Sequence, residues 1–343
     1  MSNSKPYLLI GPRKGNSNNT KVGGIVVLFE DLIGWSDKKH IPTVIIDTNK
    51  SNYSSKLVAL IQIYWRIIVK TPKCQSISLH GTANDYKFIA PFAIVFAHLF
   101  NKKIALRKFA GNFDVIYDSA TGITKKIYSF VLKKTDYLFF ETKNLVEFGK
   151  CHNSNVHWFP NVRRVPELFS PVYRNSFNGK FLFLSQISIE KGILDLLKVF
   201  WDFNGKYTLD IYGPLIDVNE SQLAVNGVHY KGTLEHKEVY KVLSNYDCLI
   251  LPSYREGYPG IIIEAFATAT PVIASSVGGI PEMITNDLQG RLFNAKNIVE
   301  LRECIDSIDK EKLEKYSKNS RISFQNYNSD IVYERLKHLI FPN

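Results

Sequence analysis

Residues 249–284, LILPSYREGYPGIIIEAFATATPVIASSVGGIPEMI, decide the fold of this chain. They begin with an apolar run that predicts a buried strand. A loop rich in glycine then carries Glu256, and a helix follows from about Gly260 with Glu264 in its opening turns. Another apolar run, residues 272–274, predicts the next strand. This order of elements is typical of an α/β domain built on a parallel sheet.

The loop before this helix has the properties of a phosphate-binding site. Gly257 and Gly260 allow backbone N–H groups to approach a ligand closely, and the helix N-terminus adds partial positive charge. Glu256 and Glu264 are eight residues apart, so their carboxylates can accept hydrogen bonds from hydroxyl groups on either side of a diphosphate. The alternative for Glu264 is an acid that only complements the helix dipole.

Short apolar runs alternate with longer helical patterns on both sides of this stretch. Such alternation predicts parallel sheets covered by helices on both faces. We expect strands at residues 7–10, 43–46, 76–79, 104–106, 137–140, 156–159, 181–184, 209–212, 228–230, 248–251 and 272–274. The final stretch, residues 297–339, is charged and predicted to be helical.

A polar segment, residues 171–179, interrupts the alternation before it restarts, and we expect a linker there. The chain of 343 residues also exceeds a single comfortable core, since domains average about 150 residues. The predicted fold is therefore α/β, with two tandem Rossmann-like domains facing a central cleft in which ligands bind. The expected parts are a first domain at residues 1–170, a second at 180–320, and a C-terminal helix at 321–343 that packs back on the first.

Charge is distributed unevenly along the chain. Residues 1–170 hold 24 Lys and Arg against 11 Asp and Glu, whereas the remaining residues hold 19 against 21. A basic half indicates an anionic partner, such as nucleic acid, an acidic membrane surface or a phosphorylated acceptor, unless the lysines only keep the surface soluble. Four cysteines without a CxxC pair indicate reduced thiols and argue against a zinc site. The N-terminus has too short an apolar run for a signal peptide.

Residues 56–70, KLVALIQIYWRIIVK, predict a helix with a wide apolar face. Gln62, Arg66 and Lys70 recur every four residues and form a narrow polar stripe. One interpretation is a helix packed on a sheet, and the other is a helix that lies in a lipid surface with Trp65 at the interface. The chain has no uninterrupted apolar run of about 18 residues, so we expect no spanning helix.

Several motifs, in order, resemble family 4 retaining glycosyltransferases of the GT-B architecture, of the kind that builds bacterial surface polysaccharides. Glu256 and Glu264 resemble that family's E-x7-E signature. LSQISIEKG, LDIYGP, YKGTLEHKEVYKVLSNYDCLILPS and WFPNVR are also similar to its motifs, and PVIASSVGGIPEMI resembles its next strand and glycine turn. The likeness covers nearly all of residues 158–290 and is weaker over residues 1–157.

The resemblance implies a role for each matching residue. Glu264 would hold the ribose hydroxyls, Glu256 would contact the transferred sugar, and Lys191 would neutralise the diphosphate. The other donor-binding residues would be Gly23, Gly24, Gln186, Gly213, Gly232, Thr233, Leu234, Tyr258, Pro259, Gly260 and Ile261.

The chain departs from the family at two positions. An arginine usually stands where Gln186 stands here, so a cation near the phosphate would have to come from Arg13, Lys14, Lys21 or Arg255, or be dispensable. The segment LRKFAGNFD also lacks a histidine that many relatives carry near the reacting carbon. His80 resembles an earlier family histidine, and it is either an active-site residue or a packed one.

The resemblance implies attack on the same face of the sugar, with the donor phosphate accepting the proton and with no metal or cofactor. We expect a UDP- or GDP-linked donor, a lipid-linked or oligosaccharide acceptor, and a peripheral position on the anionic inner face of the plasma membrane. The alternatives are a non-catalytic relative that binds a sugar nucleotide, and a basic protein that binds nucleic acid. A nucleotide-dependent oxidoreductase would need G-x-G-x-x-G after the first strand, and GPRKGNSNN lacks it. We expect no nucleic acid partner because no recognition motif stands out.

Overall fold

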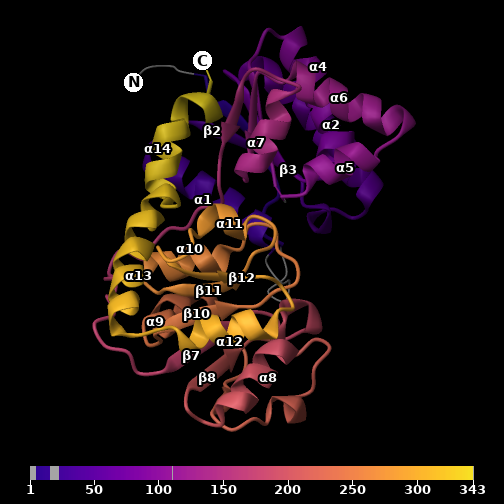
Figure 1. The fold of residues 1–343 in the computed structure, drawn as a ribbon. Coiled ribbons are helices and arrows are strands. Elements are labelled where there is room, and N and C mark those ends of the chain that lie inside the picture. Colours follow the sequence, from indigo (N-terminus) through magenta and orange to yellow (C-terminus); the bar gives the residue numbers. More distant parts are fainter. Residues whose placement is uncertain (1–4, 16–22, 110, 343) are drawn as a thin grey trace. The chain divides into compact units, whose positions relative to one another are not determined.

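The computed structural model describes residues 5–15, 23–109 and 111–342, and it divides the chain into two units (Figure 1). Unit 1 comprises Met1–Arg164 together with Ser329–Asn343, and unit 2 comprises Val165–Asn328. The division therefore falls just before the polar segment 171–179, and that segment belongs to unit 2. Of the expected C-terminal helix, residues 321–328 lie in unit 2 and only the remainder lies in unit 1.

Unit 1 contains a six-stranded parallel sheet in the order β2-β1-β3-β4-β5-β6. Its elements are β1 (Tyr7–Gly11), α1 (Gly24–Lys38), β2 (Thr43–Asp47), α2 (Lys56–Lys70), β3 (Ile77–Gly81), α3 (Ala83–Phe88), α4 (Ala90–Leu99), β4 (Ile104–Lys108), α5 (Phe113–Ser119), α6 (Gly122–Lys134), β5 (Tyr137–Phe140), α7 (Lys143–Lys150), β6 (Val156–Trp158) and α14 (Ser329–Ile340). Every residue of β3 and β4 is buried, as expected for parallel strands covered on both faces.

Unit 2 contains a second six-stranded parallel sheet in the order β12-β11-β10-β7-β8-β9. Its elements are β7 (Lys180–Leu184), α8 (Ile193–Phe203), β8 (Thr208–Tyr212), β9 (Val228–Tyr230), α9 (Val239–Leu243), β10 (Cys248–Leu251), α10 (Gly260–Ala267), β11 (Val272–Ser275), α11 (Ile280–Met283), β12 (Gly290–Phe293), α12 (Ile298–Asp306) and α13 (Lys310–Ser323). All eleven expected strands are present, and β12 is an additional strand that the sequence pattern did not predict.

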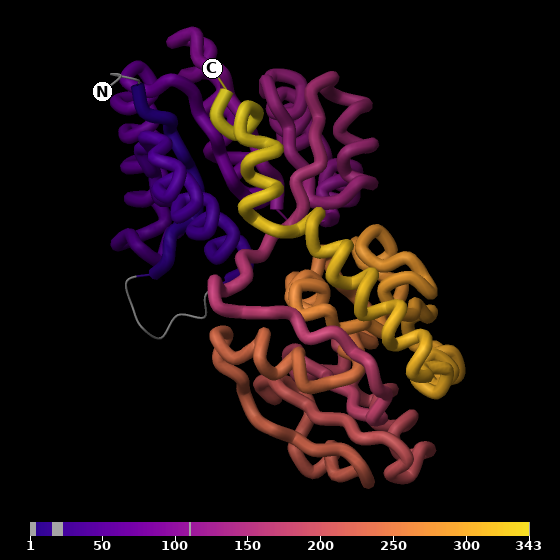
Figure 2. Tube along the Cα trace, turned by 90° about the vertical axis from the view of Figure 1, so that its left-hand side faces the viewer, coloured from indigo at the N-terminus to yellow at the C-terminus, as the bar shows by residue number. Residues whose placement is uncertain are grey.

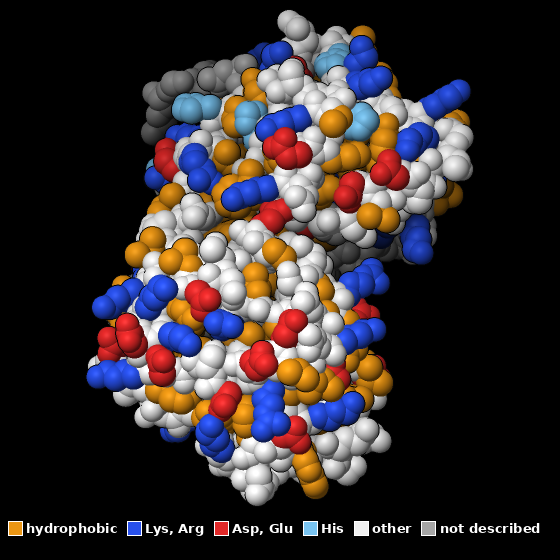
Figure 3. All heavy atoms as spheres, in the orientation of Figure 1, with side chains coloured by type: hydrophobic (Ala, Val, Ile, Leu, Met, Phe, Trp, Pro, Cys, Tyr) orange, Lys and Arg blue, Asp and Glu red, His pale blue; other side chains and the backbone are white. Residues whose placement is uncertain are grey.

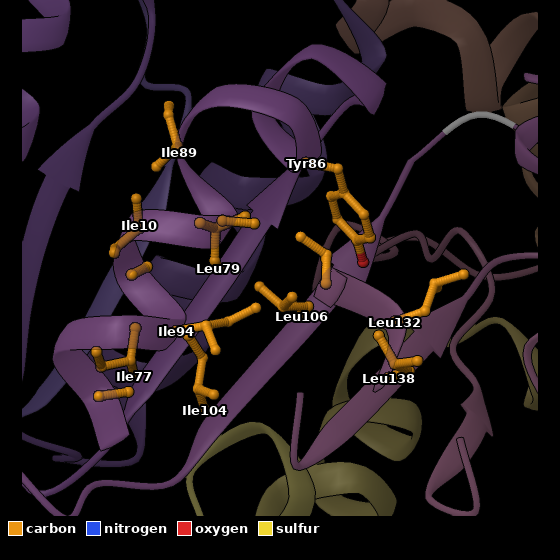
Figure 4. Packing of buried hydrophobic residues seen from close by; sticks show 14 of the residues in the cluster. Ile10, Ile77, Leu79, Tyr86, Ile89, Ile94, Ile104, Leu106, Leu132 and Leu138 are labelled. Atoms are coloured by element: carbon orange, nitrogen blue, oxygen red, sulfur yellow. The ribbon is translucent and has the colours of Figure 1, made fainter. Parts of the chain in front are cut away.

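The core of unit 1 on one side of its sheet is a continuous aliphatic cluster (Figure 4). Ile77 and Leu79 of β3, Leu106 of β4 and Ile94 of α4 all belong to it, and all four are at most 1% exposed. Helices α2, α4 and α6 contribute to this cluster and cover this face of the sheet. The apolar residues that recur on the inner side of each of these three helices are therefore the ones that pack in the core.

Helix α14 completes the opposite side of the same unit, although it is the last element of the chain. Its residues Tyr333 and Ile340 are buried in a second cluster with Trp35 of α1. The Tyr333 hydroxyl donates a hydrogen bond to the carbonyl oxygen of Leu28 at 3.3 Å, and Phe341 stacks on Trp35. Figure 2 shows this yellow helix beside the indigo and magenta segments of unit 1.

The polar segment 171–179 is held to unit 2 by one buried side chain. The guanidinium group of Arg174 donates hydrogen bonds to the carbonyl oxygens of Val172, Leu243 and Thr268, among others. Burial lowers the pKa of Arg174 to about 10, and the several acceptors compensate for its desolvation. The segment expected to be a linker is thus an anchored part of unit 2.

Among the described residues, no helix combines the length and the apolar character needed to cross a bilayer.

Candidate functional site

The predicted donor residues of unit 2 gather at the carboxyl edge of its sheet. The strand order places β7 beside β10, and the chain runs outward from these two strands in opposite directions. Such a switch point is where open α/β sheets bind ligands. The loop after β7 carries Gln186 and Lys191, and the loop after β10 carries Glu256. Two segments that are about 65 residues apart in sequence thus meet at one edge.

Three glycines allow these loops to approach one another closely. A Cβ atom on Gly192 would lie 2.0 Å from the carbonyl oxygen of Pro252, and one on Gly213 would lie 1.7 Å from that of Ser185. A Cβ atom on Gly278 would lie 2.0 Å from the carbonyl oxygen of Glu256 itself. The three also have positive φ angles of 73°, 145° and 56°, which side chains with a Cβ rarely adopt. These glycines therefore determine how the loops pack.

Lys191 and Glu256 form the central polar contact of this edge. The Lys191 Nζ lies 2.6 Å from Oε1 of Glu256, and the hydroxyl of Ser253 donates to the same oxygen at 2.7 Å. The Lys191 and Glu256 side chains remain 21% and 10% exposed, respectively. The structure thus brings together two of the three predicted catalytic residues. Ser253 was missed, and its position at the end of β10, three residues before Glu256, was the available signal.

The N-terminus of α10 lies in the same loop and has an anion-binding character. Pro259 is its cap residue, and in the described structure no side chain caps this end and no acid lies in its first turn. The N–H groups of a first helical turn have no intrahelical partners, and they attract anions. Tyr258 is buried, and its hydroxyl donates to that of Tyr327 at 3.2 Å. The packing of Tyr258 therefore holds in place the loop that leads into Gly260 and Ile261.

Glu264 projects from α10 and is almost entirely buried, with a 7% exposed side chain. Its Oε1 lies 3.7 Å from Nε2 of His236, which belongs to the loop after β9. A buried carboxylate near a polar loop suits the recognition of paired hydroxyl groups. His236 was not singled out from the sequence, although it lies within the segment YKGTLEHK that carries the resemblance.

The remaining predicted donor residues of unit 2 lie in the neighbouring loops. The N–H of Gly213, after β8, donates to the carbonyl oxygen of Gly232, after β9, at 2.9 Å. Thr233 is exposed and Leu234 is half-buried in the same loop. Gln186 is exposed in the loop after β7. The structure therefore places all the predicted donor residues of unit 2 in the adjoining loops and the α10 N-terminus at one sheet edge.

Position 186 has no cation, and the basic residues that could supply one instead differ in their environments. Arg255 is exposed beside Glu256 in the sequence. Arg13 lies in unit 1, where its Nε is 2.7 Å from Oε1 of Glu30. The backbone N–H of Lys14 donates to the same carboxylate oxygen, and Lys21 lies outside the described residues. Within unit 2, Arg255 is thus the candidate nearest to the loop in question.

Unit 1 has its own switch point, which lies between β1 and β3. Its cavity of about 540 Å³ is in a different place. A cavity of about 450 Å³ lies at the switch point and is lined by residues that follow β1, β2 and β3. Gly23 and Gly24 line it at the N-terminus of α1, where the described structure has no side-chain cap. A Cβ on either glycine would meet nothing within 4 Å. The two glycines of the predicted loop thus line a cavity beside a helix N-terminus.

His80 is the last residue but one of β3 in unit 1, and it is only 1% exposed. Its ring lies among Phe29, Phe109 and Phe159, and its Nε2 is 3.0 Å from the Ser78 hydroxyl. Burial, and then the charge of Arg107, lower its pKa well below the ordinary value. Of the two alternatives left open by the sequence, this environment is that of a packed histidine.

Lys108 lies at the end of the neighbouring strand, in the segment that lacks the family's histidine. It is 1% exposed, its Nζ donates to the carbonyl oxygen of Phe109, and burial lowers its pKa to about 8. A buried amine at a strand end was not predicted, because a lysine in a short basic run is typical of an exposed surface.

Comparison with known proteins agrees with this fold. Residues 166–323 match the family model described as glycosyl transferases group 1. The structure also resembles the solved structure of Anabaena HepE in complex with UDP, with a TM-score of 0.72 and 12% identity over 98% of this chain and 99% of that chain. A similar likeness, with a TM-score of 0.71 and 14% identity over 98% and 99%, exists to the lipopolysaccharide outer core galactosyltransferase WaaB.

The fold is therefore GT-B, and the chain is a glycosyltransferase whose residues 166–323 match the group 1 model.

Two relatives are similar to this chain in sequence. An uncharacterised 41.2 kDa protein in the cps region of Klebsiella pneumoniae is 26% identical over 262 residues, which are 70% of this chain and 72% of that protein. A Campylobacter jejuni enzyme, N,N'-diacetylbacillosaminyl-diphospho-undecaprenol alpha-1,3-N-acetylgalactosaminyltransferase, is 33% identical over 110 residues, or 32% of this chain and 29% of the enzyme. The second match thus spans less than a third of either protein.

Proposed function

We propose that this glycosyltransferase moves a sugar, with retention of anomeric configuration, from a nucleoside diphosphate sugar to a lipid-linked saccharide in the synthesis of a cell-surface polysaccharide. The observation that carries the donor half of the proposal is the Lys191–Glu256 pair at the β7–β10 switch point, beside the uncapped N-terminus of α10. A cation and a helix end next to each other suit a diphosphate.

Each part of a nucleotide sugar has a suitable group in this loop cluster. The diphosphate would lie against the N–H groups of Gly260 and Ile261, with the Lys191 ammonium group countering the charge that develops on the leaving nucleotide. Glu264 would accept hydrogen bonds from the ribose hydroxyls, and Glu256 from the transferred sugar. The solved relatives HepE with UDP and HepE with UDP-glucose support a nucleotide sugar as the donor, and a UDP- or GDP-linked sugar is the donor proposed here.

The proposed chemistry breaks the bond between the anomeric carbon and the diphosphate oxygen and forms a bond from that carbon to the acceptor oxygen on the same face. The acceptor hydroxyl's proton passes to the departing phosphate oxygen. Lys191 and the α10 N-terminus stabilise the charge on that phosphate. The proposal requires no metal or cofactor, and activity that survives chelation with EDTA would support it.

The acceptor half of the proposal rests on the relatives and on unit 1. The Campylobacter jejuni relative is named for a diphospho-undecaprenol substrate, the Klebsiella pneumoniae relative is encoded in a cps region, and a Bacillus subtilis relative is a putative teichuronic acid biosynthesis glycosyltransferase. The cavity beside Gly23 and Gly24 has a helix N-terminus suited to a phosphate. A lipid-linked acceptor would hold the enzyme at the inner face of the plasma membrane as a peripheral protein.

A thermal-shift screen tests the donor assignment. UDP, GDP, ADP and their sugars are added to the full chain, and the nucleotide that fits is expected to raise the melting temperature because it binds only the folded state. The positive nucleotide sugar is then incubated with undecaprenyl-diphosphate-linked sugars, and the anomeric configuration of the product is read by NMR. Failure of every nucleotide to stabilise the protein, or a product of inverted configuration, would contradict the corresponding part of the proposal.

A non-catalytic relative remains the second candidate, because Gln186 supplies no charge at the position where the family resemblance implies a cation. It is distinguished by the same experiment. Such a protein would be stabilised by the nucleotide sugar but would neither transfer nor hydrolyse it. Restoring the cation with Gln186→Arg would then be expected to produce measurable turnover.

A further inference from the structure

Helix α2 exposes an apolar face that the packing of unit 1 does not use. Ala59, Ile63 and Ile67 fill its buried side. The opposite side carries Leu57, Ile61, Trp65 and Val69, all exposed and each four residues from the next. Four large apolar side chains in register on one helix differ from the scattered single residues that soluble surfaces normally show.

Helix α4 extends this apolar face sideways. Tyr64 of α2 stacks on Phe92 of α4, with ring centroids 4.4 Å apart, and its hydroxyl donates to the carbonyl oxygen of Phe88 at 2.7 Å. The two helices are thereby held side by side. The exposed apolar residues of this second part are Phe88, which ends α3, Val95 and Leu99 of α4, and Phe100, which follows α4. We call the eight exposed residues of the two parts the α2–α4 surface.

The sequence that carries the α2–α4 surface is rich in basic residues, and one acid from outside it, Asp136, lies 2.9 Å from the Nζ of Lys103 and 3.9 Å from Nε2 of His98. Neither α2 nor α4 contains an acidic residue. The only acid in residues 56–103 is Asp85, which accepts hydrogen bonds from Thr82. The basic residues of this stretch are Lys56, Arg66, Lys70, Lys73, Lys87, Lys102 and Lys103. Figure 3 shows basic and hydrophobic side chains next to one another on the face of unit 1 in view, together with several acidic ones.

We propose that the α2–α4 surface docks on an anionic phospholipid bilayer, with α2 lying in the plane of the interface. Its apolar side chains would enter the boundary between headgroups and acyl chains, where Trp65 has the amphipathic ring typical of that depth. The surrounding lysines would contact the phosphate groups of anionic lipids, which attract basic residues close to the membrane surface. The inference deepens the proposed function, since it rests on a membrane-bound acceptor, but its test requires no turnover.

The polar side of α2 lies beside a second cavity, and this arrangement supports the orientation. Gln62 and Arg66 line the cavity of about 540 Å³ together with both basic and acidic residues, among them Arg13, Glu30 and Asp47. Docking through Leu57, Ile61 and Trp65 would leave this hydrogen-bonding cavity next to the lipid headgroups, where a polar part of a membrane component can reach it. Gln62 and Arg66 of the polar stripe therefore lie neither in the core nor on the α2–α4 surface.

Co-sedimentation of the full chain with vesicles tests the proposal. Vesicles of phosphatidylcholine alone are compared with vesicles of equal parts phosphatidylcholine and phosphatidylglycerol. Binding is expected only to the second kind, and it should fall when salt rises from about 0.1 M to about 1 M, because the Debye length shrinks from about 10 Å to about 3 Å. Equal binding to both kinds of vesicle, or none to either, would overturn it.

Matched variants locate the surface. Trp65 is 65% exposed and Trp201, on α8 of unit 2, is 68% exposed. Trp65→Glu is expected to lower the partition coefficient at least about tenfold, because it removes an interfacial ring and adds a negative charge, whereas Trp201→Glu should leave it unchanged. Equal effects of the two variants would contradict the assignment to α2.

A spectroscopic readout covers the case in which Trp65→Glu disturbs folding. The vesicle-induced blue shift of tryptophan fluorescence should disappear in Trp65→Phe and persist in Trp201→Phe. The opposite pattern would overturn the proposal, as would a dimer in sedimentation velocity that Trp65→Glu dissociates while vesicles bind neither protein. Nucleotide-induced thermal stabilisation should be the same in Trp65→Glu as in the unaltered chain. Loss of membrane binding is therefore separable from failure of the donor assignment.

Discussion

The Lys191 Nζ lies 2.6 Å from Oε1 of Glu256, and the two side chains come from loops that follow different strands of the same sheet. The lysine is the group proposed to counter phosphate charge, and the glutamate is the group proposed to contact the sugar. The contact between them therefore joins the group proposed for the phosphate to the group proposed for the sugar. Either side chain therefore influences the position of the other.

Lys191→Met should lower the rate of sugar transfer by about 10²–10³-fold, since removing one preorganised stabilising group from a transition state has effects of this size. Steady-state transfer from the donor identified by thermal shift provides the measurement. Lys198→Met, which changes an exposed lysine on α8, is the matched control and should retain full activity. Unchanged transfer by Lys191→Met would show that the diphosphate charge is countered elsewhere.

Glu264→Gln should weaken nucleotide binding by about 10- to 100-fold, because a carboxylate that accepts hydrogen bonds from hydroxyls contributes about 1.5–3 kcal/mol. Isothermal titration calorimetry with the nucleoside diphosphate measures this directly. The shape of the residue is retained, so the buried site should not collapse. Glu303→Gln, an exposed acid on α12, serves as the control. Equal affinities of the two variants would mean that Glu264 only stabilises its helix.

Gly213→Ala should destabilise unit 2 by about 3 kcal/mol or more, because its φ of 145° is unfavourable for alanine and its Cβ would lie 1.7 Å from the Ser185 carbonyl oxygen. Thermal unfolding is the measurement. Gly34→Ala in α1 is the contrasting variant, since its Cβ would meet nothing within 4 Å, and it should gain about 0.5–1 kcal/mol from reduced chain entropy. A tolerated Gly213→Ala would contradict the observed loop packing.

Lys108→Met should reduce the gain in stability that the unaltered chain shows as the pH rises above 8. Burial lowers the pKa of Lys108 from 10.5 to about 8 in the folded chain. Below pH 8 the lysine is protonated in both states and the full desolvation cost is present. Between pH 8 and 10.5 the unfolded chain binds more protons, so stability rises with pH, by about 3 kcal/mol for this group alone.

Urea unfolding of the unaltered chain and of Lys108→Met at pH 7, 9 and 10 measures the difference, because all other titrating groups are common to both proteins. The unaltered chain should gain more stability over this range than the variant does. Lys126→Met, at an exposed position on α6, should behave as the unaltered chain. Parallel pH profiles for Lys108→Met would show that the amine does not lose its proton in the folded state.

The strands were predictable because residues buried on both faces of a parallel sheet form continuous apolar runs. β12 was missed because its sequence, GRLF, has a glycine and an arginine in four residues. Gly290 has a φ of 158°, and its absent Cβ allows contact with the Val272 backbone. Contacts of this kind depend on the neighbouring strand, and local sequence does not record them.

The donor loops were predictable from their motifs, but their contacts were not. Spacing along the chain does not reveal that Lys191 meets Glu256, since the order of strands in the sheet brings the two loops together. Burial was equally hidden for His80 and Lys108, because polar residues at strand ends occur both at ligand sites and in packed interiors. His236 and Ser253 were overlooked for the same reason: their importance comes from a partner distant in sequence.

Helix α14 makes unit 2 an insertion within unit 1, because the chain leaves the first unit after Arg164 and returns to it at Ser329. During synthesis, Trp35 therefore has no Tyr333 or Phe341 to pack against until the ribosome has translated all of unit 2. Unit 2 has all of its residues earlier and can fold while the first unit is still waiting for its last helix. Premature termination near residue 328 would thus leave an aromatic surface uncovered on the half that was made first.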